Sequence, residues 1–290
     1  MYWVRQIEVI AGGKVFESIG DNALDIEFDV PFSDKNEPDV STITIYNLSE
    51  SSINSIEKQG TVSLTAGYRE LHNMAEILSG QIENIKTEFK SLDKVTTITI
   101  SDGAKSWRKT EFNNTYKNDT KASTIMNDLC DELGYPIAEL KPKNDIVYPL
   151  GKTIKGVASK SLIQLAKDTE SKMFINKGRI VIRAEEEGYN SGILLNAESG
   201  LLDTPTLNEN NTGDQVDSAE AGNEKPAQKS WTVKCLLNPQ IETDMIINIE
   251  SRSINGAFRV KSGKHSKDFI TELELSLIHI SEPTRPRLIS

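Results

Sequence analysis

TITIYNLSESSINSIEKQGTVSLTAGY, residues 42–68, predicts two β-strands joined by a short helix. Apolar residues alternate with polar ones in both strands, which is the period of a strand with one buried face. They are Ile43 and Ile45 in the first strand, and Val62, Leu64 and Ala66 in the second. We therefore expect the two strands to be neighbours in one sheet.

The connection between these strands predicts a helix that covers the sheet. Ser49 is a residue type that caps the first amides of a helix, and Ile53 and Ile56 lie three residues apart on one helical face. Gly60 follows the expected helix end, where glycine is favoured. The unit is therefore expected to be a sheet with a helical plug.

The combination of IYNLS, a short helix and V-x-L-x-AGY resembles the N-terminal barrel of phage and prophage tail hub proteins. These are the baseplate hub or tail-tip hub proteins of the late control protein D-like family. Gly80-Gln81-Ile82 matches the G-x-I element of that family, and two later stretches resemble the closing strands of its second barrel: LLNPQI at 236–241 and GAFRV at 256–260, followed by His265. One position departs from the pattern, because Asp244 precedes the I-x-I strand where the family often has glycine.

The resemblance implies a mainly β fold with α+β insertions: two antiparallel β-barrel domains with small inserted α/β modules. The expected divisions are 1–105 for the N-terminal barrel, 106–118 for a strand crossing into the second barrel, 119–190 for the inserted modules, 191–202 for a strand returning to the second barrel, 203–230 for a flexible acidic loop and 231–274 for the closing strands. Trp107 and Tyr116 are expected at the crossing between the barrels.

Helical and hairpin patterns support the inserted modules. Residues 121–133 place apolar side chains on one helical face and end at Gly134, and residues 159–170 form a second amphipathic stretch with Ser159 available as its N-cap. Asn176-Lys177-Gly178 then predicts the turn of a hairpin between two apolar strands.

The C-terminal residues break the pattern. Residues 275–285, LSLIHISEPTR, read as the in-frame translation of a transposase-end sequencing adapter. We therefore interpret residues 275–290 as adapter-derived rather than native. The natural chain is expected to continue past Glu274 into residues that are missing here.

Composition excludes several classes of protein. Hydrophobic residues make up 37% of the chain and charged residues 26%, as in globular proteins, and no apolar run has the length of a membrane span. The N-terminus lacks the pattern of a signal peptide, so folding in a bacterial cytoplasm is expected. A net charge of −10 argues against sequence-specific or nonspecific binding of nucleic acid.

The sequence contains no convincing catalytic, cofactor or metal site. Cys130 and Cys235 both lie in apolar-periodic segments, which predicts buried thiols, and His72 and His265 are the only histidines outside the C-terminal segment. No HExxH, paired CxxC or GxxxxGK[ST] motif occurs. We therefore expect no enzyme activity, no cofactor and no metal.

Acidic and aromatic residues also fit structural roles better than catalytic ones. Acidic residues that fit a solvated strand face, loop or helix face are Asp25, Glu27, Asp29, the run at 185–187, Asp131 and Glu132. Trp3, Trp107 and Trp231 lie at strand or domain borders, which favours packing over binding although a subunit interface is the sharper alternative.

The resemblance implies a structural component of a phage or phage-like tail. It would form the homotrimeric hub that joins the tail tube to the central spike or tail tip, located in the virion tail. One alternative is the N-terminal hub part of a truncated tail-associated peptidoglycan hydrolase, which the sequence after Glu274 would decide. Another is a free carbohydrate-binding β module, which a sugar-binding monomer would favour.

Overall fold

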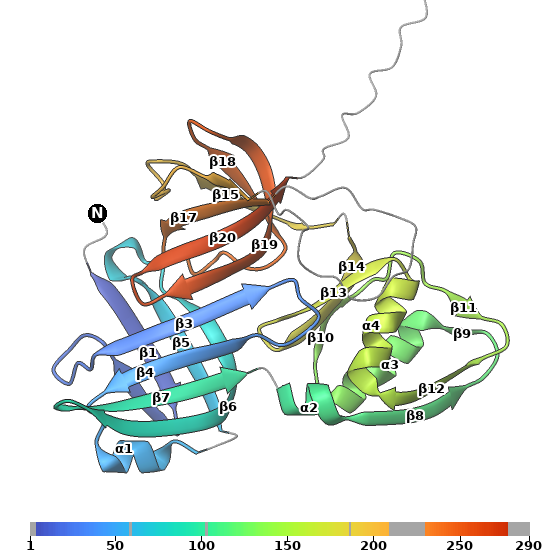
Figure 1. Ribbon diagram of the computed structural model, residues 1–290, viewed down its shortest axis with the longest axis horizontal. Helices are drawn as coiled ribbons and strands as arrows, with labels where there is room; N and C mark the ends of the chain where they lie inside the picture. Colours follow the sequence, from blue (N-terminus) through green and yellow to red (C-terminus); the bar gives the residue numbers. More distant parts are fainter. Residues whose placement is uncertain (1–3, 58–59, 102–103, 186, 209–229, 278–290) are drawn as a thin grey trace, which may run out of the picture.

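The computed structural model describes residues 4–57, 60–101, 104–185, 187–208 and 230–277. Three hydrophobic cores divide this part of the chain into a first half, an insert and a second half (Figure 1). Strands dominate both halves, and the helices are concentrated in the insert. The expected mainly β fold with α+β insertion is confirmed at this level.

Seven strands form the first half, and their buried residues alternate along the chain. They are β1 (Arg5–Ala11), β2 (Lys14–Glu17), β3 (Ile26–Ser33), β4 (Val40–Tyr46), β5 (Thr61–Tyr68), β6 (Ala75–Lys90) and β7 (Asp93–Ser101). Their order in the sheet is β3-β4-β7-β6-β5-β1-β2, and every neighbouring pair is antiparallel.

The two strands of residues 42–68 form as predicted, but their expected pairing is wrong. β4 pairs with β3 and β7, whereas β5 pairs with β1 and β6. Two strands therefore separate β4 from β5 in the sheet. The alternation of apolar residues identifies the buried face of a strand and carries no information about its neighbour.

The short helix α1 (Glu50–Ser55) lies at one end of the first half (Figure 1). The side chain of Ser49 accepts a hydrogen bond from the backbone N–H of Ser52 at 3.2 Å, which confirms the predicted cap. Ile56 is buried and Ile53 packs against the first core. The helix therefore covers apolar side chains at the end of the sheet.

The insert combines three short sheets with three helices. Its elements are α2 (Ala104–Lys109), β8 (Glu111–Tyr116), β9 (Thr120–Lys121), α3 (Ala122–Leu133), β10 (Ile137–Leu140), β11 (Val147–Tyr148), β12 (Lys152–Val157), α4 (Ala158–Asp168), β13 (Ser171–Asn176) and β14 (Arg179–Ala184). The apolar faces of α3 and α4 share one core with β13 and β14. The two predicted helices and the hairpin are confirmed.

One of the two predicted helix-end signals is confirmed and the other is wrong. Gly134 ends α3 in the left-handed conformation, with φ 76°, as predicted. Ser159 is not the N-cap of α4, because Val157 occupies that position without a side-chain hydrogen bond and Ser159 is buried in the first turn. The hairpin turns through Lys177 and Gly178, both at positive φ.

Residues 106–118 do not cross into the second half, contrary to the expectation. β8 pairs with β12 inside the insert, and Trp107 is buried in the insert's core with Tyr116 packed against it. The apolar residues that suggested a barrel crossing therefore belong to the insert.

The second half contains six strands. They are β15 (Tyr189–Leu195), β16 (Thr206–Asn208), β17 (Ser230–Leu236), β18 (Met245–Glu250), β19 (Asn255–Ser266) and β20 (Ile270–Leu277). β15 runs parallel to β18, and all other pairs are antiparallel. β16 lies within the region 203–230 that was expected to be a loop, and residues 209–229 of that loop lie outside the described residues.

A single large sheet runs through both halves, because β3 of the first half pairs with β19 of the second. Among the described residues, no pairing joins β2 to β3 or β15 to β16, so neither half closes into the β-barrel that was expected. The strand order is thus that of one continuous sheet that wraps around two cores.

β20 extends three residues beyond Glu274. Leu275 is fully buried in the second core and pairs with Trp231 and Val260, whereas Leu277 is half exposed. These residues take part in the sheet whatever their origin. The proposed adapter origin of 275–290 stays a prediction, and residues 278–290 lie outside the described residues.

Asp145 is expected to stabilise α3 from outside the helix. Its carboxylate accepts hydrogen bonds from the N–H and the Oγ of Ser123, both at 2.9 Å, in the first turn of α3. Asp145→Ala should lower the free energy of unfolding by about 1 kcal/mol because those first-turn donors lose their acceptor. Urea unfolding measures this, with the exposed Glu132→Ala of the same helix as control. Equal effects of the two substitutions would contradict the cap.

Candidate functional site

The two halves are joined by an antiparallel strand pairing, which we call the seam. Residues 29–33 of β3 pair with residues 262–266 of β19. β19 reaches both halves because a bulge at Lys261 interrupts its register with β20. Before the bulge β19 pairs with β18, and after it the same edge pairs with β3.

Close packing under the seam requires a residue without a side chain. A Cβ atom on Gly263 would lie 2.3 Å from Cζ of Phe32. The Phe32 ring in turn lies 4.9 Å, centroid to centroid, from the imidazole of His265. Glycine therefore allows the aromatic ring of one half to pack over the strand of the other.

His265 is neutral and buried at the seam. It is 3% exposed, and its Nδ1 lies 3.0 Å from Oγ1 of Thr271. Burial, with a smaller contribution from the Lys177 cation, lowers the pKa of His265 to about 3. The imidazole thus acts as a packing group with one polar partner.

The turn after β19 carries an apolar side chain into the core of the other half. Phe269 is buried in the first core, with its ring 5.5 Å from Tyr68 and 5.9 Å from Phe28. The hydroxyl of Tyr68 donates to the backbone carbonyl of Phe269 at 3.3 Å. Leu237, from the segment after β17, joins the same core. The first core is therefore completed by residues from the C-terminal part of the chain.

Ion pairs cross the outer face of the seam. Lys264 Nζ lies 2.7 Å from Asp29 Oδ2, and Lys267 Nζ lies 2.9 Å from Glu27 Oε1. Both pairs are largely exposed, so solvent screens them and they contribute little to stability. The acidic strand face that was expected to be solvated thus faces lysines of the second half.

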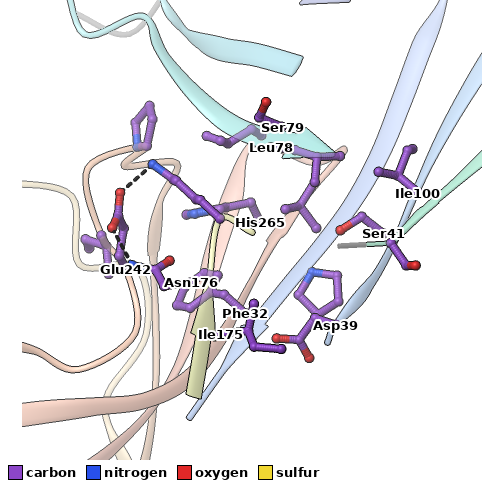
Figure 2. A pocket seen from close by; sticks show the side chains of 17 residues that line it. Phe32, Asp39, Ser41, Leu78, Ser79, Ile100, Ile175, Asn176, Glu242 and His265 are labelled. Carbon is purple, nitrogen blue, oxygen red and sulfur yellow. Dashed lines mark hydrogen bonds and ion pairs between the residues drawn. The ribbon is translucent and has the colours of Figure 1, made fainter. Parts of the chain in front are cut away.

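The β13–β14 hairpin of the insert reaches the seam from the side (Figures 1 and 2). At its tip, Asn176 Nδ2 donates to Glu242 Oε2 at 2.9 Å, and Lys177 forms an ion pair with the same carboxylate. Lys177 also donates to the backbone carbonyl of Glu76 at 3.2 Å. The tip thus contacts both halves at once.

A small cavity of about 50 Å³ remains where these three parts meet (Figure 2). Side chains from every part line it, among them Phe32, Leu78, Ile175 and His265. Sites for small organic ligands typically have volumes of roughly 300 Å³ or more. This space is therefore a packing junction and too small for such a ligand.

One carboxylate beside the cavity is held by a neighbouring hydroxyl. Ser33 Oγ donates to Asp39, 3.1 Å from each carboxylate oxygen. Burial raises the pKa of Asp39, and the Ser33 hydrogen bond opposes that shift. Asp39 thus anchors the end of β3 to the start of β4.

A second contact holds the base of the hairpin, through a group of charges that we call the charge cluster: Asp244, Lys172, Arg183 and Arg259. The fully buried Asp244 carboxylate lies 2.5 Å from Lys172 Nζ, 2.6 Å from Arg183 Nη2 and 3.3 Å from Arg259 Nη1. Lys172 and Arg183 face each other across β13 and β14, whereas Asp244 and Arg259 belong to the second half. The charge cluster therefore ties the insert to the second half.

Further groups balance the three cations. Glu139 Oε2 lies 3.5 Å from Arg183 Nη1, and Arg259 donates to the backbone carbonyl of Glu185 at 3.0 Å. The guanidinium of Arg183 stacks 3.6 Å from the centre of the Tyr189 ring. Burial lowers the pKa of Lys172, and the Asp244 carboxylate opposes that shift.

The backbone of Asp244 explains the departure from the family pattern. Its φ is +70°, in the left-handed region that favours glycine but that Asp and Asn also adopt. Its N–H donates to Val260 at 2.8 Å and its carbonyl accepts from Tyr189 at 2.9 Å. The turn geometry expected for glycine is thus kept, and the aspartate adds a buried charge to it.

The charge cluster was missed in the sequence. A usable signal was present in RIVIRA, residues 179–184, where Arg183 interrupts an otherwise apolar strand. A cation at such a position needs a buried partner. The sequence pattern alone does not say which of the many carboxylates provides it.

The cysteine and histidine residues that the sequence offers for catalysis lie apart in the structure. Cys130 is buried in the core of the insert and Cys235 in that of the second half, and burial raises the pKa of each thiol to about 12. His72 is exposed in a turn, and His265 lies in the seam. The predicted buried thiols are confirmed, and no Cys–His pair forms among these residues.

The tryptophans and acids also have structural surroundings. Trp107 packs edge-on against Tyr135 at 5.6 Å in the insert, and Trp231 is partly buried against the second core. Trp3 and Glu186 lie outside the described residues. Of the acids considered, Asp25, Asp131, Glu132, Glu185 and Glu187 are exposed.

The described part of the chain lacks a metal-binding cluster and a membrane-spanning helix. No group of three or more His, Cys, Asp or Glu side chains there is arranged to hold a metal ion. No helix there is long and apolar enough to cross a membrane.

Comparisons with known proteins agree with this architecture. The family described as Baseplate hub gp41 matches residues 37–262, which is most of the chain. No curated protein is similar enough in sequence to match. Solved structures are similar in fold at low sequence identity.

Three of these structures illustrate the similarity. A 43 kDa tail protein of prophage MuSo2 from Shewanella oneidensis has a TM-score of 0.65 at 9% identity, covering 94% of this chain and 98% of that one. A tail protein from Neisseria meningitidis has a TM-score of 0.65 at 9% identity, covering 95% and 97%. An E. coli component of the type VI secretion system, c3393, has a TM-score of 0.54 at 13% identity, covering 92% and 77%.

Asp244→Asn should destabilise the protein by about 3–5 kcal/mol, because Lys172 and Arg259 lose their ion-pair partner and Arg183 keeps only Glu139. Asparagine tolerates the same φ, so the substitution tests the charge and not the backbone. Urea unfolding of the whole chain measures the loss, with the exposed Asp268→Asn as matched control. A loss no larger than that of the control would contradict the role of the charge cluster.

His265 should make stability fall as pH falls. Its pKa is about 3 in the folded state and about 6.5 when unfolded, so the unfolded chain binds more protons between these values. The contribution of His265 is therefore complete above about pH 6.5 and is lost toward pH 3, by at most about 1.4 kcal/mol per pH unit.

Urea unfolding at several pH values tests this expectation against His265→Gln. Subtracting the two stability curves removes the contribution of the carboxylates that both proteins share. The difference should fall steadily as pH decreases below about 6.5. A difference that does not change with pH would show that His265 is not held neutral by the fold.

Proposed function

Because this chain belongs to the Baseplate hub gp41 family, we propose that three copies form the hub that joins a phage tail tube to its central spike or tail tip. The chain is a structural component of the phage tail baseplate. The proposal adds the number of copies and the two neighbours in the tail.

One observation carries the proposal: the two halves of the chain repeat a single strand order. In the first half the order is β3-β4-β7-β6-β5-β1, and in the second it is β16-β17-β20-β19-β18-β15. Numbered along the chain without β2, both read second, third, sixth, fifth, fourth, first. Three copies would therefore present six similar β units, which suits a ring between a three-fold spike and a six-fold tube.

The connections between the parts support a load-bearing role. The seam joins the halves by backbone hydrogen bonds, and Phe269 and Leu237 bury the second half's side chains in the first core. Glu242 and Asp244 hold the tip and the base of the insert's hairpin. A hub that transmits force between tube and spike needs such fixed relative positions.

The proposal treats each half as a barrel-like unit whose described strands do not close in the single chain. Each half wraps its strands around one core, and the open ends of the sheet would be covered on assembly. Exposed strand edges invite uncontrolled pairing, so a ring that covers them protects the chain.

The negative net charge suits a channel through which nucleic acid passes without being bound. The chain carries a net charge of −10, and phosphate binding requires clustered cations. A ring through which DNA passes benefits from weak attraction. The partners proposed are therefore tube and spike proteins.

The purified chain should have a mass three times the 32.2 kDa of one copy. Light scattering or mass photometry at micromolar concentration measures it, and repeating the measurement with the tube and spike proteins of its own tail includes assembly that needs a partner. A single-copy mass under both conditions would contradict the proposed hub.

A further inference from the structure

β6 and β19 occupy the same place in the two halves. Each is the fifth strand of its half when β2 is left out, and each is the longest, with 16 and 12 residues. Both are bulged in their pairing with the next strand, β6 at Glu83 and β19 at Lys261. Before the bulge, each pairs on its other side with the preceding strand, β5 or β18.

The two strands differ after the bulge. The edge of β19 pairs there with β3 to make the seam. In the described part of the chain, β6 pairs from Asn84 to Lys90 with β7 alone. We call this part of β6, residues 84–90, the open edge. It presents the backbone groups that β19 uses at the seam, without a strand to receive them.

The strand of the second half that is equivalent to β3 is β16. In the strand order of the described residues β16 lies at one end of the sheet, with β17 as its neighbour. The registers align them residue by residue. Asp29 pairs with Thr42 and Thr42 with Thr99, while Thr206 pairs with Thr232 and Thr232 with Glu274. Asp29 and Thr206 therefore correspond, and so do Pro31 and Asn208.

The same alignment relates the open edge to the seam residues of β19. Ile85 pairs with Ile98, and Gly263 pairs with Leu273 in the equivalent place. Counting from these pairs, Lys86 corresponds to Lys264 and Glu88 to Ser266. Lys264 lies opposite Pro31 and Ser266 opposite Asp29 at the seam.

We propose that the open edge of β6 receives β16 of a second copy of this chain, in antiparallel pairing with Lys86 opposite Asn208 and Glu88 opposite Thr206. The proposal rests on the proposed trimeric hub and specifies its subunit contact. The occupant is a second copy because the contact repeats the seam. At the seam, β19 of the second half pairs with β3 of the first half of the same chain. At the proposed contact, the equivalent strand β6 of the first half pairs with the equivalent strand β16 in the second half of the next copy. Such head-to-tail contacts close into a ring when the rotation from one copy to the next closes, as the proposed trimer requires.

The turns that follow these strands support the same contact. The turn between β19 and β20 places Phe269 in the core of the first half, 3% exposed. The equivalent turn between β6 and β7 carries Phe89 and Leu92, which are 79% and 96% exposed. In Figure 1 this turn lies on the side of the first half away from the insert. A neighbouring second half would bury these side chains as the first half buries Phe269.

Polar side chains also make cross-strand contacts at the two places. On β6 the exposed Thr87 has its Oγ1 3.1 Å from Oγ1 of the buried Thr96, and on β19 Nδ1 of the buried His265 lies 3.0 Å from Oγ1 of Thr271. Lys86 is 65% exposed and pairs with Glu88 at 2.6 Å on the outer face, where Lys264 pairs with Asp29 at the seam. The open edge thus combines unpaired backbone groups with exposed polar side chains on the side where a strand could pair.

Disulfide cross-linking between copies tests the register. Glu88→Cys and Thr206→Cys are made in separate chains, mixed and oxidised. Opposed residues of antiparallel strands have Cα atoms about 4.5–5.5 Å apart, within the range of a disulfide. We expect a covalent dimer of one chain of each kind, and the chain carrying both substitutions should give covalent trimers. Cys130 and Cys235 are buried, so they contribute little background.

A register control uses Asn84→Cys in place of Glu88→Cys. Asn84 lies four residues away, about 13 Å along the strand, so it should not cross-link to Thr206→Cys. A trimer that forms without the Glu88–Thr206 disulfide would overturn the strand contact and leave the trimeric hub standing. A chain that remains a monomer with its tail partners would overturn both.

Leu92→Asp provides a second test that does not depend on oxidation. Leu92 is 96% exposed, so a charge there should leave the single chain folded. We expect the concentration at which trimers dissociate to rise at least about tenfold, because a charge at Leu92 would have to be buried in the contact. The matched control is Leu150→Asp, 91% exposed in the insert. Equal dissociation of the two variants would contradict the contact.

Discussion

The pairing of β3 with β19 is the constraint on which the rest of the structure depends. It makes one sheet of two halves that lie far apart in sequence. The bulge at Lys261 lets a single strand serve both halves, and Gly263 admits the ring of Phe32 beneath it. Backbone hydrogen bonds thus set the relation between the halves, and the side chains of Phe269 and Leu237 bury apolar surface on that frame.

The segment between β17 and β18 coordinates all three parts of the molecule. Leu237 enters the first core, Glu242 binds the tip of the insert's hairpin, and Asp244 binds its base. The two carboxylates lie two residues apart, so a shift of this segment would disturb the seam and the insert together. A buried charge is costly unless it is paired, and two of the three cations around Asp244, Lys172 and Arg183, come from the insert.

Local structure was largely predictable from sequence, because alternation, caps and turns are local signals. The strands around Ile43 and Leu64, the cap at Ser49 and the hairpin at Asn176-Lys177-Gly178 are examples. Strand partners were not predictable in the same way. β4 and β5 have similar patterns, yet β7 and β6 lie between them. The charge cluster escaped notice because its four residues come from four separate stretches, and charge alone does not reveal which pairs are buried.

The seam also determines how late the fold can be completed during translation. The seam residues of β3 end at Ser33, whereas their partners in β19 begin at Ser262. The ribosome must therefore release the chain as far as Ser266 before the seam can be completed. The insert has its own core and the local contacts to form earlier. Until then the first half exposes a strand edge and the pocket that Phe269 later fills. Newly made chains therefore pass through a stage at which an unpaired strand edge and apolar surface are exposed to aggregation.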